Sequence, residues 1–339
     1  FYKIRREEYR QRLKKVQDGM AAKNIGTLVV YGDTLDYANV CYLTGWVPKE
    51  GYAFLIVNSS GDPVLVVSQP SRDMPYTKTI NFIEDIRTLG PKDKLEDIIR
   101  STASGEIRFS EPIDKAPHKL VAKAVGAGKP FETDREIIEN LRKIKSKAEV
   151  GIVLEAAELA KKCINRICEN QKYETENQLY ADLSFYAKAG GAQDVRVMIN
   201  IEDPCFRPPE NRRLPDNFSI IQLYIAVCVD RYWCDLTAQL DCDGGVLSQR
   251  PMNGICEDVI NLIKPGVRIG DIDSLLQKVS GLVPSRYISG IGFNLEEEPV
   301  SPDVRLERNM LLSAFVPDSK GRVYKRLLLM TKDGCKALI

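Results

Sequence analysis

The spacing of apolar residues in the first part of the chain switches repeatedly between helical and strand periods. Residues 3–24 carry apolar side chains at helical spacing, whereas residues 27–32 form a continuous apolar run typical of a buried strand. A Ser-Ser-Gly-Asp-Pro turn separates two more strand-like runs within residues 52–68. This alternation predicts an α/β domain over residues 1–132. Its remaining predicted elements are helices at 94–103 and 117–127 and a strand at 106–110.

The second part of the chain combines long amphipathic stretches with longer strand-like runs. A broad apolar face between Lys147 and Glu169 predicts one long helix, and residues 175–190 predict another, which Thr175 can cap. These patterns favour an α+β domain over residues 133–339, in which helices cover an antiparallel sheet. Strands are predicted at 194–201, 218–241 and 324–334, and a helix–turn–helix pattern at 254–281.

Composition and charge exclude several classes of partner. The 339 residues are 44% hydrophobic and 28% charged, which is typical of a globular protein with a sizeable core. A net charge of +1 gives no general attraction to nucleic acid or to an anionic membrane, and no apolar run reaches the length of a membrane span. The nine cysteines contain no Cys-x-x-Cys pair and the opening residues are charged, so we expect a cytoplasmic protein with reduced thiols.

Several stretches, taken in order, resemble the creatinase / aminopeptidase P / prolidase superfamily, which has the pita-bread fold and is related to peptidase family M24. Each stretch is weakly specific alone, but together they extend over nearly the whole chain. The resemblance implies an N-terminal α/β domain followed by a pita-bread domain, which is a curved antiparallel sheet backed by helices. The matching stretches are NVCYLTGW (39–46), LRKIKSKAEVGIVLEAAELA (141–160), RYWCDLTAQ (231–239), IKPGVRIGDID (263–273), SGIGFNLEEEP (289–299) and LLLMTKDGCKAL (327–338).

The resemblance also implies a site for two divalent metals, held in the family by two Asp, one His and two Glu. Oxygen and imidazole ligands suit such ions, and the metal pair activates a bridging water. Only one of these five ligand positions keeps its residue in this chain, namely Asp235. The other four positions fall on Tyr224, Ser289, Val316 and Lys325.

This set of residues does not suit a pair of divalent ions. The Lys325 ammonium would repel a cation, and the only histidine of the chain, His118, lies in the first domain. We therefore expect no metal and no other cofactor. Creatinase shows that the fold can cleave a C–N bond without metal, but the histidine that creatinase uses is also missing here.

Polar residues of the former metal site supply the candidates for chemistry. Asp235 and Glu297 are the candidate acid–base groups, and Arg207 is a candidate for gripping a carboxylate because its planar fork suits that group. Each has an ordinary structural explanation as well. Asp235 can be an acid that only forms hydrogen bonds to the backbone, Glu297 can belong to a solvated acidic turn, and Arg207 can fix the position of a loop. The full candidate set is Asp235, Glu296 and Glu297 for catalysis, and Arg207, Tyr224, Tyr232 and Ser289 for substrate binding.

Two hypotheses about function remain open from the sequence. The first is a metal-independent enzyme that cleaves or rearranges a C–N bond in a small, amino-acid-like and carboxylated substrate. The alternative is a non-catalytic pseudo-peptidase that acts as a binding or interaction protein, since a fold does not determine its function. By analogy with the family, we expect a homodimer in either case.

Overall fold

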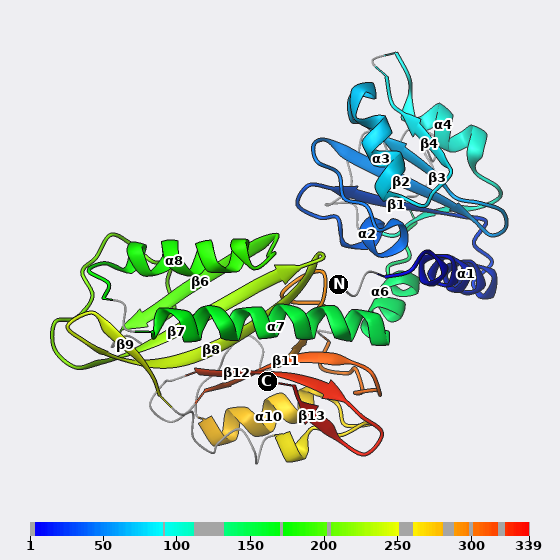
Figure 1. Cartoon of the computed structure of the whole chain (residues 1–339). Coiled ribbons are helices and arrows are strands. Elements are labelled where there is room, and N and C mark those ends of the chain that lie inside the picture. Colours follow the sequence, from blue (N-terminus) through cyan, green and yellow to red (C-terminus); the bar gives the residue numbers. More distant parts are fainter. Residues whose placement is uncertain are drawn as a thin grey trace. The chain divides into compact units, whose positions relative to one another are not determined.

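A computed structural model describes residues 4–90, 92–111, 132–169, 172–201, 205–250, 260–280, 288–297, 301–317 and 323–338. The chain divides into two compact units, of which one is Ile4–Arg142 and the other contains Lys143–Ile339 (Figure 1). The domain boundary that the sequence predicts, between residues 132 and 133, stays a prediction. Within the described part, no helix is both long and apolar enough to span a membrane.

The first unit is built on a five-stranded mixed sheet with the order β4-β3-β2-β1-β5 (Figure 1). Apolar side chains of four strands and one helix form its core, which includes Val29, Phe54, Val66 and Ile99. β1 pairs antiparallel with β2 and parallel with β5. The strands are β1 (Thr27–Asp33), β2 (Tyr52–Asn58), β3 (Val64–Val67), β4 (Asp85–Thr88) and β5 (Ile107–Phe109).

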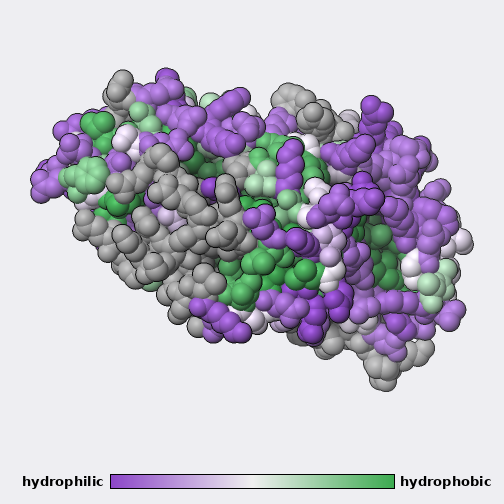
Figure 2. Space-filling view, turned by 90° about the horizontal axis from the view of Figure 1, so that it is seen from below, coloured by the Kyte–Doolittle hydropathy of each residue, from purple (hydrophilic) through white to green (hydrophobic). Residues whose placement is uncertain are grey.

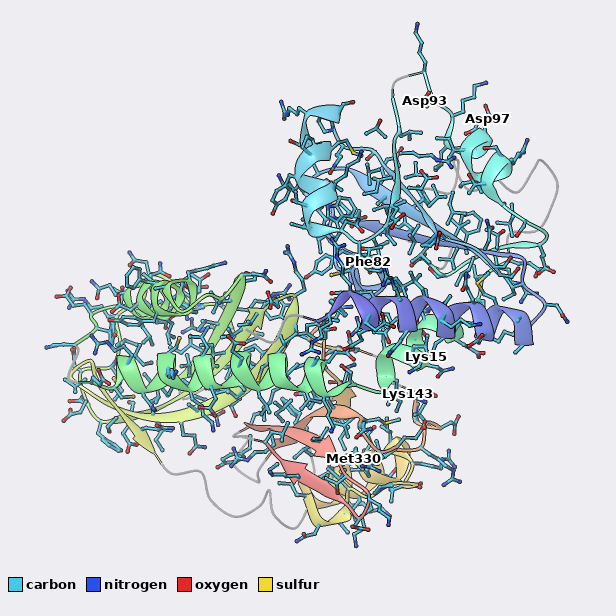
Figure 3. The ribbon with its side chains drawn as sticks, turned by 45° about the vertical axis from the view of Figure 1, so that its right-hand side comes forward. Lys15, Phe82, Asp93, Asp97, Lys143 and Met330 are labelled. Atoms are coloured by element: carbon cyan, nitrogen blue, oxygen red, sulfur yellow. The ribbon has the colours of Figure 1, made fainter. Side chains whose placement is uncertain are left out.

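Helices surround this sheet. Tyr9, on the first helix, stacks on Phe82 with ring centroids 4.9 Å apart; Phe82 is labelled in Figure 3. The helices are α1 (Arg6–Ala22), α2 (Ala38–Thr44), α3 (Met74–Ile80), α4 (Leu95–Thr102) and α6 (Glu136–Lys143), with a 3-10 turn at Ser71–Asp73. Lys143, labelled in Figure 3, is the last residue of α6 and lies at the division between the units.

The second unit contains two four-stranded sheets (Figure 1). The first has the order β6-β7-β8-β9 and is antiparallel throughout. Its strands are β6 (Asp194–Ile201), β7 (Ser219–Val229), β8 (Tyr232–Asp243) and β9 (Val246–Arg250). The second has the order β10-β11-β12-β13, with β10 (Ile288–Gly290), β11 (Leu311–Pro317), β12 (Val323–Met330) and β13 (Cys335–Ala337).

Two long helices cover one face of the β6–β9 sheet. α7 (Lys147–Ile167) packs along β7 and β8, and α8 (Glu176–Ala189) packs on α7 and β6 (Figure 1). Each begins with a capping box, formed by Ser146 with Glu149 and by Thr175 with Gln178. These reciprocal bonds satisfy the first backbone N–H groups of a helix and fix where it begins.

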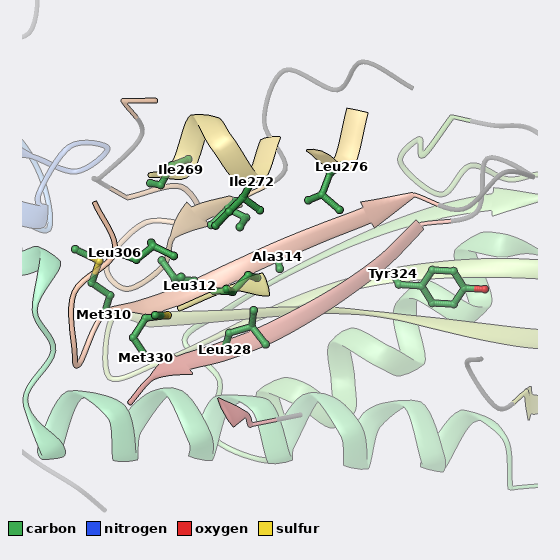
Figure 4. Packing of buried hydrophobic residues seen from close by; sticks show 12 residues of the cluster. Ile269, Ile272, Leu276, Leu306, Met310, Leu312, Ala314, Tyr324, Leu328 and Met330 are labelled. Atoms are coloured by element: carbon green, nitrogen blue, oxygen red, sulfur yellow. The ribbon is translucent and has the colours of Figure 1, made fainter. Parts of the chain in front are cut away.

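The β10–β13 sheet has its own hydrophobic layer against α10 (Ile269–Ser280). Ile269, Ile272 and Leu276 of α10 lie over Leu312 and Leu328 of the sheet (Figure 4). Because side chains alternate along a strand, the odd-numbered residues of β11 and β12 point to the opposite face. Ser313 and Lys325 are among these residues, and that opposite face carries the candidate site.

The structure confirms the predicted fold class, an α/β N-terminal domain and an α+β pita-bread domain. The predicted 218–241 strand is the hairpin β7–β8, and the strand predicted at 324–334 is shorter, since β12 ends at Met330. Several short elements, among them α2, α3, β4, β9 and β10, were not predicted because each is too brief to show a period. The predicted helix at 117–127 lies outside the described residues.

Figure 2 shows a face on which hydrophilic residues predominate and hydrophobic residues gather in limited areas between them. Such areas are ordinary for a folded protein, because polar atoms cannot cover the whole surface.

Candidate functional site

A tight hairpin between β7 and β8 fixes the position of Asp235. Asp230 and Arg231 both have positive φ angles, of 45° and 73°, which is the pattern of a two-residue type I′ turn. This turn pairs Val229 with Tyr232 and therefore places Asp235 directly opposite Ala226. The register of the whole hairpin follows from the turn.

The two faces of β8 have different surroundings. The Tyr232 hydroxyl donates to Glu149 Oε1 of α7 at 3.0 Å, so Tyr232 and the residues at even positions face the helices. Trp233, Asp235 and Thr237 face the opposite side, which we call the inner face of the β6–β9 sheet. Cys234, on the helix side, is buried, and burial raises its pKa well above the ordinary value.

Asp235 is fully buried and accepts hydrogen bonds from three side chains. The Ser313 hydroxyl donates to Oδ1 at 2.8 Å, and the Tyr224 hydroxyl lies 3.3 Å from Oδ2. The Lys325 ammonium forms an ion pair with the same Oδ2. β7, β8, β11 and β12 therefore each contribute one residue to this group, which we call the Asp235 cluster: Tyr224, Asp235, Ser313 and Lys325.

Burial and charge act together on the cluster. Burial, followed by the charge of Asp235, raises the pKa of Tyr224, so this hydroxyl keeps its proton over the physiological range. The Lys325 ammonium lies 5.2 Å from the centre of the Tyr224 ring, and its side chain is 17% exposed. Because Asp235 itself is inaccessible, Lys325 is the charged group through which the cluster can meet a ligand.

The residues at the implied metal positions do not fit a divalent cation. The Lys325 ammonium occupies the contact to Asp235 that a metal would need, and Ser289 lies opposite Ser313 in the strand register. In the register of β11 and β12, Phe315 is paired with Lys325 and Val316 with Tyr324. Among the described residues, no three His, Cys, Asp or Glu side chains are grouped to hold a metal ion.

Glu297, the second candidate acid–base group, forms a buried ion pair with Lys145. Its Oε2 lies 2.7 Å from Lys145 Nζ, both side chains are 2% exposed, and its Oε1 accepts from the Phe293 N–H at 2.7 Å. A Cβ on Gly292 would come within 2.6 Å of this carboxylate, so the glycine is needed here. Phe293 also packs on Tyr232, which places Glu297 with the residues of the helix side.

The remaining candidates lie in separate surroundings. Glu296 is exposed, unlike its neighbour Glu297. Arg207 forms two bonds to the buried Glu176 of α8, at 2.6 and 2.7 Å. Burial alone would raise the pKa of Glu176, but the bonds from Arg207 and from the Glu210 N–H lower it below the ordinary value. The structure therefore brings Tyr224 and Asp235 together, with Ser289 opposite Ser313, whereas the carboxylate of Glu297 pairs with Lys145 and the fork of Arg207 with Glu176.

Three residues near Asp235 were missed as functional candidates. Ser313 and Lys325 touch Asp235 directly, and Arg196 on β6 shares the inner face, because the register pairs it with Ala226. The alternating pattern of β6 was the only available signal for Arg196. The sole histidine, His118, lies outside the described residues.

Comparison with known families gives the same assignment as the fold. The model of the creatinase/prolidase N-terminal domain matches residues 12–113, and the model of metallopeptidase family M24 matches residues 152–320. The chain belongs to the creatinase / aminopeptidase P / prolidase superfamily. A protein of Staphylococcus aureus (strain bovine RF122 / ET3-1) named "uncharacterized peptidase" is 24% identical over 328 residues, covering 88% of this chain and 92% of the relative. A protein of Staphylococcus saprophyticus with the same description is also 24% identical, with the same coverage.

Solved structures of this superfamily have the same fold. A prolidase from Pyrococcus furiosus superimposes with a TM-score of 0.77 at 18% identity, over 96% of this chain and 98% of that one. An X-Pro aminopeptidase from Thermotoga maritima gives a TM-score of 0.78 at 14% identity, over 96% of each chain. Membership in this superfamily of peptidases supports a hydrolytic, peptidase-like role.

Proposed function

We propose that this protein is a metal-independent hydrolase that cleaves a C–N bond in a small, amino-acid-like, carboxylated molecule. The observation that carries the proposal is the ion pair between Lys325 and the buried Asp235, at the place where the family binds its metals. A fixed ammonium there supplies positive charge without a metal ion. The proposal therefore keeps the reaction class of the family and changes the source of the charge.

The chemistry follows from the properties of the cluster. Hydrolysis adds hydroxide to the carbonyl carbon and a proton to the leaving nitrogen, and negative charge develops on the carbonyl oxygen. The partly exposed Lys325 ammonium can donate to that oxygen, and preorganised donors of this kind stabilise the transition state. Asp235 orients Lys325 through their ion pair, and Tyr224, which retains its proton, holds Asp235.

A second candidate function is binding of the same class of molecule without turnover. The observation that favours it is that three donors already occupy the Asp235 carboxylate, which leaves it little capacity to accept a proton from water. In that case Lys325 would still receive a carbonyl or carboxylate oxygen. Both functions place the ligand on the inner face of the sheet.

The test combines turnover, binding and metal analysis. Protein purified without chelator would be incubated with N-acyl amino acids and dipeptides, with and without EDTA, beside the Lys325→Met variant and the exposed control Lys336→Met. We expect turnover that EDTA leaves unchanged and that only Lys325→Met loses. Activity that requires added Mn²⁺ or Co²⁺ would refute metal independence, and saturable binding by calorimetry without product would establish the second function.

The accompanying expectations belong to the same proposal. We propose that the protein acts as a homodimer in the cytoplasm on a small molecule, without nucleic acid or membrane as a partner. Sedimentation of the purified chain tests the first of these points.

A further inference from the structure

Arg196 lies on the inner face of the β6–β9 sheet, on the row that contains Asp235. The strand register pairs Arg196 with Ala226, and Ala226 with Asp235, so the three residues point to the same side. Since neighbouring strands are about 4.8 Å apart, the Cα atoms of Arg196 and Asp235 are roughly 10 Å apart. The side chains of Arg196 and of Lys325, which is paired with Asp235, can therefore reach one small ligand.

The guanidinium of Arg196 rests on an aromatic ring. Its central carbon lies 4.9 Å from the centre of the Trp233 ring, and Trp233 is itself only 4% exposed. A cation at this distance from an indole face is attracted by the ring quadrupole. The buried indole thus gives an otherwise exposed arginine a defined place on the inner face.

Unlike Arg207, Arg196 keeps its hydrogen-bond donors available. The guanidinium of Arg207 donates two hydrogen bonds to the Glu176 carboxylate. Arg196 is exposed and, within the described part of the chain, forms no hydrogen bond or ion pair through its guanidinium. The nearest acid along its own strand face, Asp194, accepts a bond from the Val195 N–H. A planar fork of unused N–H donors suits a carboxylate, which it can bind with two bonds.

Tyr224 connects this arginine to the Asp235 cluster. The charge of Arg196 acts on the Tyr224 hydroxyl, and Lys325 lies 5.2 Å from the Tyr224 ring. Phe206 packs edge-on against the same ring at 6.2 Å. Two cations therefore flank one tyrosine, with an aromatic side chain beside them. This arrangement suits a molecule that carries a carboxylate and a carbonyl a few bonds apart.

We propose that Arg196, held over Trp233, receives the carboxylate of the ligand while Lys325 receives its carbonyl oxygen. This inference rests on the proposed function, because it uses the same face, and it names the ligand class as N-acyl amino acids or similar amides with a free carboxylate. It also assigns to Arg196 the role that the sequence had suggested for Arg207.

The two tryptophans of the chain provide a direct reporter. Trp46 lies in the first unit and Trp233 beneath Arg196, so protein labelled with 5-fluorotryptophan gives one ¹⁹F signal for each. The Trp233→Phe variant assigns the signals, and the Arg196→Met variant identifies the Trp233 signal independently, because it removes the stacked cation. The probes are N-acetylglycine, its neutral amide N-acetylglycinamide and inorganic phosphate.

We expect N-acetylglycine to shift the Trp233 signal saturably and the Trp46 signal not at all. N-acetylglycinamide should bind at least about tenfold more weakly, because a charge-assisted hydrogen bond is lost. Arg196→Met should weaken N-acetylglycine by a similar factor, Arg196→Lys should restore part of the affinity, and the exposed control Arg212→Met should leave it unchanged. Equal binding of the two amides, binding unaffected by Arg196→Met, or binding of phosphate in place of the carboxylate would each overturn the inference.

The same samples separate this inference from the proposed function. Carboxylate-dependent binding without any cleavage would keep the role of Arg196 and refute hydrolysis. Cleavage of N-acetylglycine and N-acetylglycinamide at equal rates would support hydrolysis and refute the role of Arg196. The Lys325→Met variant should retain the Trp233 response at reduced affinity, since the carboxylate contact remains.

Discussion

Asp235 of β8 and Lys325 of β12 form an ion pair in which the carboxylate is fully buried and the ammonium is mostly buried. The two residues come from different sheets of the second unit, and Ser313 and Tyr224 complete the bonds to Asp235. The pair therefore links the two sheets at the centre of the candidate site. Its contribution to stability and its effect on metal binding can be measured separately.

Removing one partner of this pair should destabilise the protein strongly. The Lys325→Met variant leaves the Asp235 charge buried without its counterion, and we expect the free energy of unfolding to fall by about 2–4 kcal/mol. Adding Asp235→Asn should recover part of the loss, because the buried charge disappears. Urea unfolding of both single variants and the double variant measures the coupling, with the exposed Lys336→Met as control. Additive effects of the two substitutions would contradict a coupled pair.

Metal should stabilise the site only after the ammonium is removed. The Lys325→Glu variant puts two carboxylates side by side, and a divalent cation relieves their repulsion. We expect about 1 mM Mn²⁺ to raise the unfolding temperature of this variant by about 2 °C or more. The unfolding temperature of the unsubstituted protein should not change. Lys325→Gln is the matched control. A response of the unsubstituted protein to Mn²⁺ or to EDTA would show that the site still binds metal.

The sequence was informative where a local pattern decided the structure. The apolar run at 218–241 predicted strand structure, which the β7–β8 hairpin confirms, and Asp235 was recognised from the resemblance of the RYWCDLTAQ stretch to the family. The partners of the candidates could not be predicted in the same way, because Lys325 lies 90 residues after Asp235 and Lys145 lies 152 residues before Glu297. No periodicity encodes such contacts, which depend on how the sheets pack.

Arg207 and Arg196 also show that contacts between distant parts of the chain cannot be predicted from local sequence. Arg207 was chosen because it lies in the loop where creatinase has its histidine, but its partner Glu176 is on α8, 31 residues earlier. Arg196 looked like an ordinary polar residue of an alternating strand, and only the register of three strands shows that it shares a face with Asp235. The fork of Arg207 is bonded to Glu176, whereas Arg196 shares the face of Asp235, and the sequence pattern around each arginine reveals neither fact.

Glu297 and its neighbour Glu296 form a natural pair of variant and control. Glu297→Gln removes the negative charge opposite the buried Lys145 ammonium, and we expect a loss of about 3 kcal/mol in the free energy of unfolding. Glu296→Gln changes an exposed carboxylate and should alter stability by less than about 0.5 kcal/mol. Chemical unfolding at neutral pH compares the two. Equal losses in the free energy of unfolding would indicate that any acidic charge in this turn stabilises the protein, and that the buried ion pair contributes nothing beyond that.

Glu111 of the first unit should make stability depend on pH. Its carboxylate accepts bonds from the Tyr31 N–H at 2.7 Å and the Asn39 amide at 3.1 Å, but burial dominates and raises its pKa from 4.5 to about 7. A carboxyl group whose pKa is raised by folding stabilises the native state while it is protonated. That contribution is complete below the pKa of the unfolded chain, near 4.5, and is lost as the pH rises through about 7.

The Glu111→Gln variant isolates this effect, since glutamine is neutral at every pH. We expect the difference in unfolding free energy between the variant and the unsubstituted protein to grow in favour of the variant between pH 5 and pH 8, by about 2–4 kcal/mol. Urea titrations at several pH values measure this difference, and contributions from all other groups cancel in it. A difference that does not vary with pH would mean that Glu111 stays ionised in the native protein, with the Tyr31 and Asn39 bonds outweighing its burial.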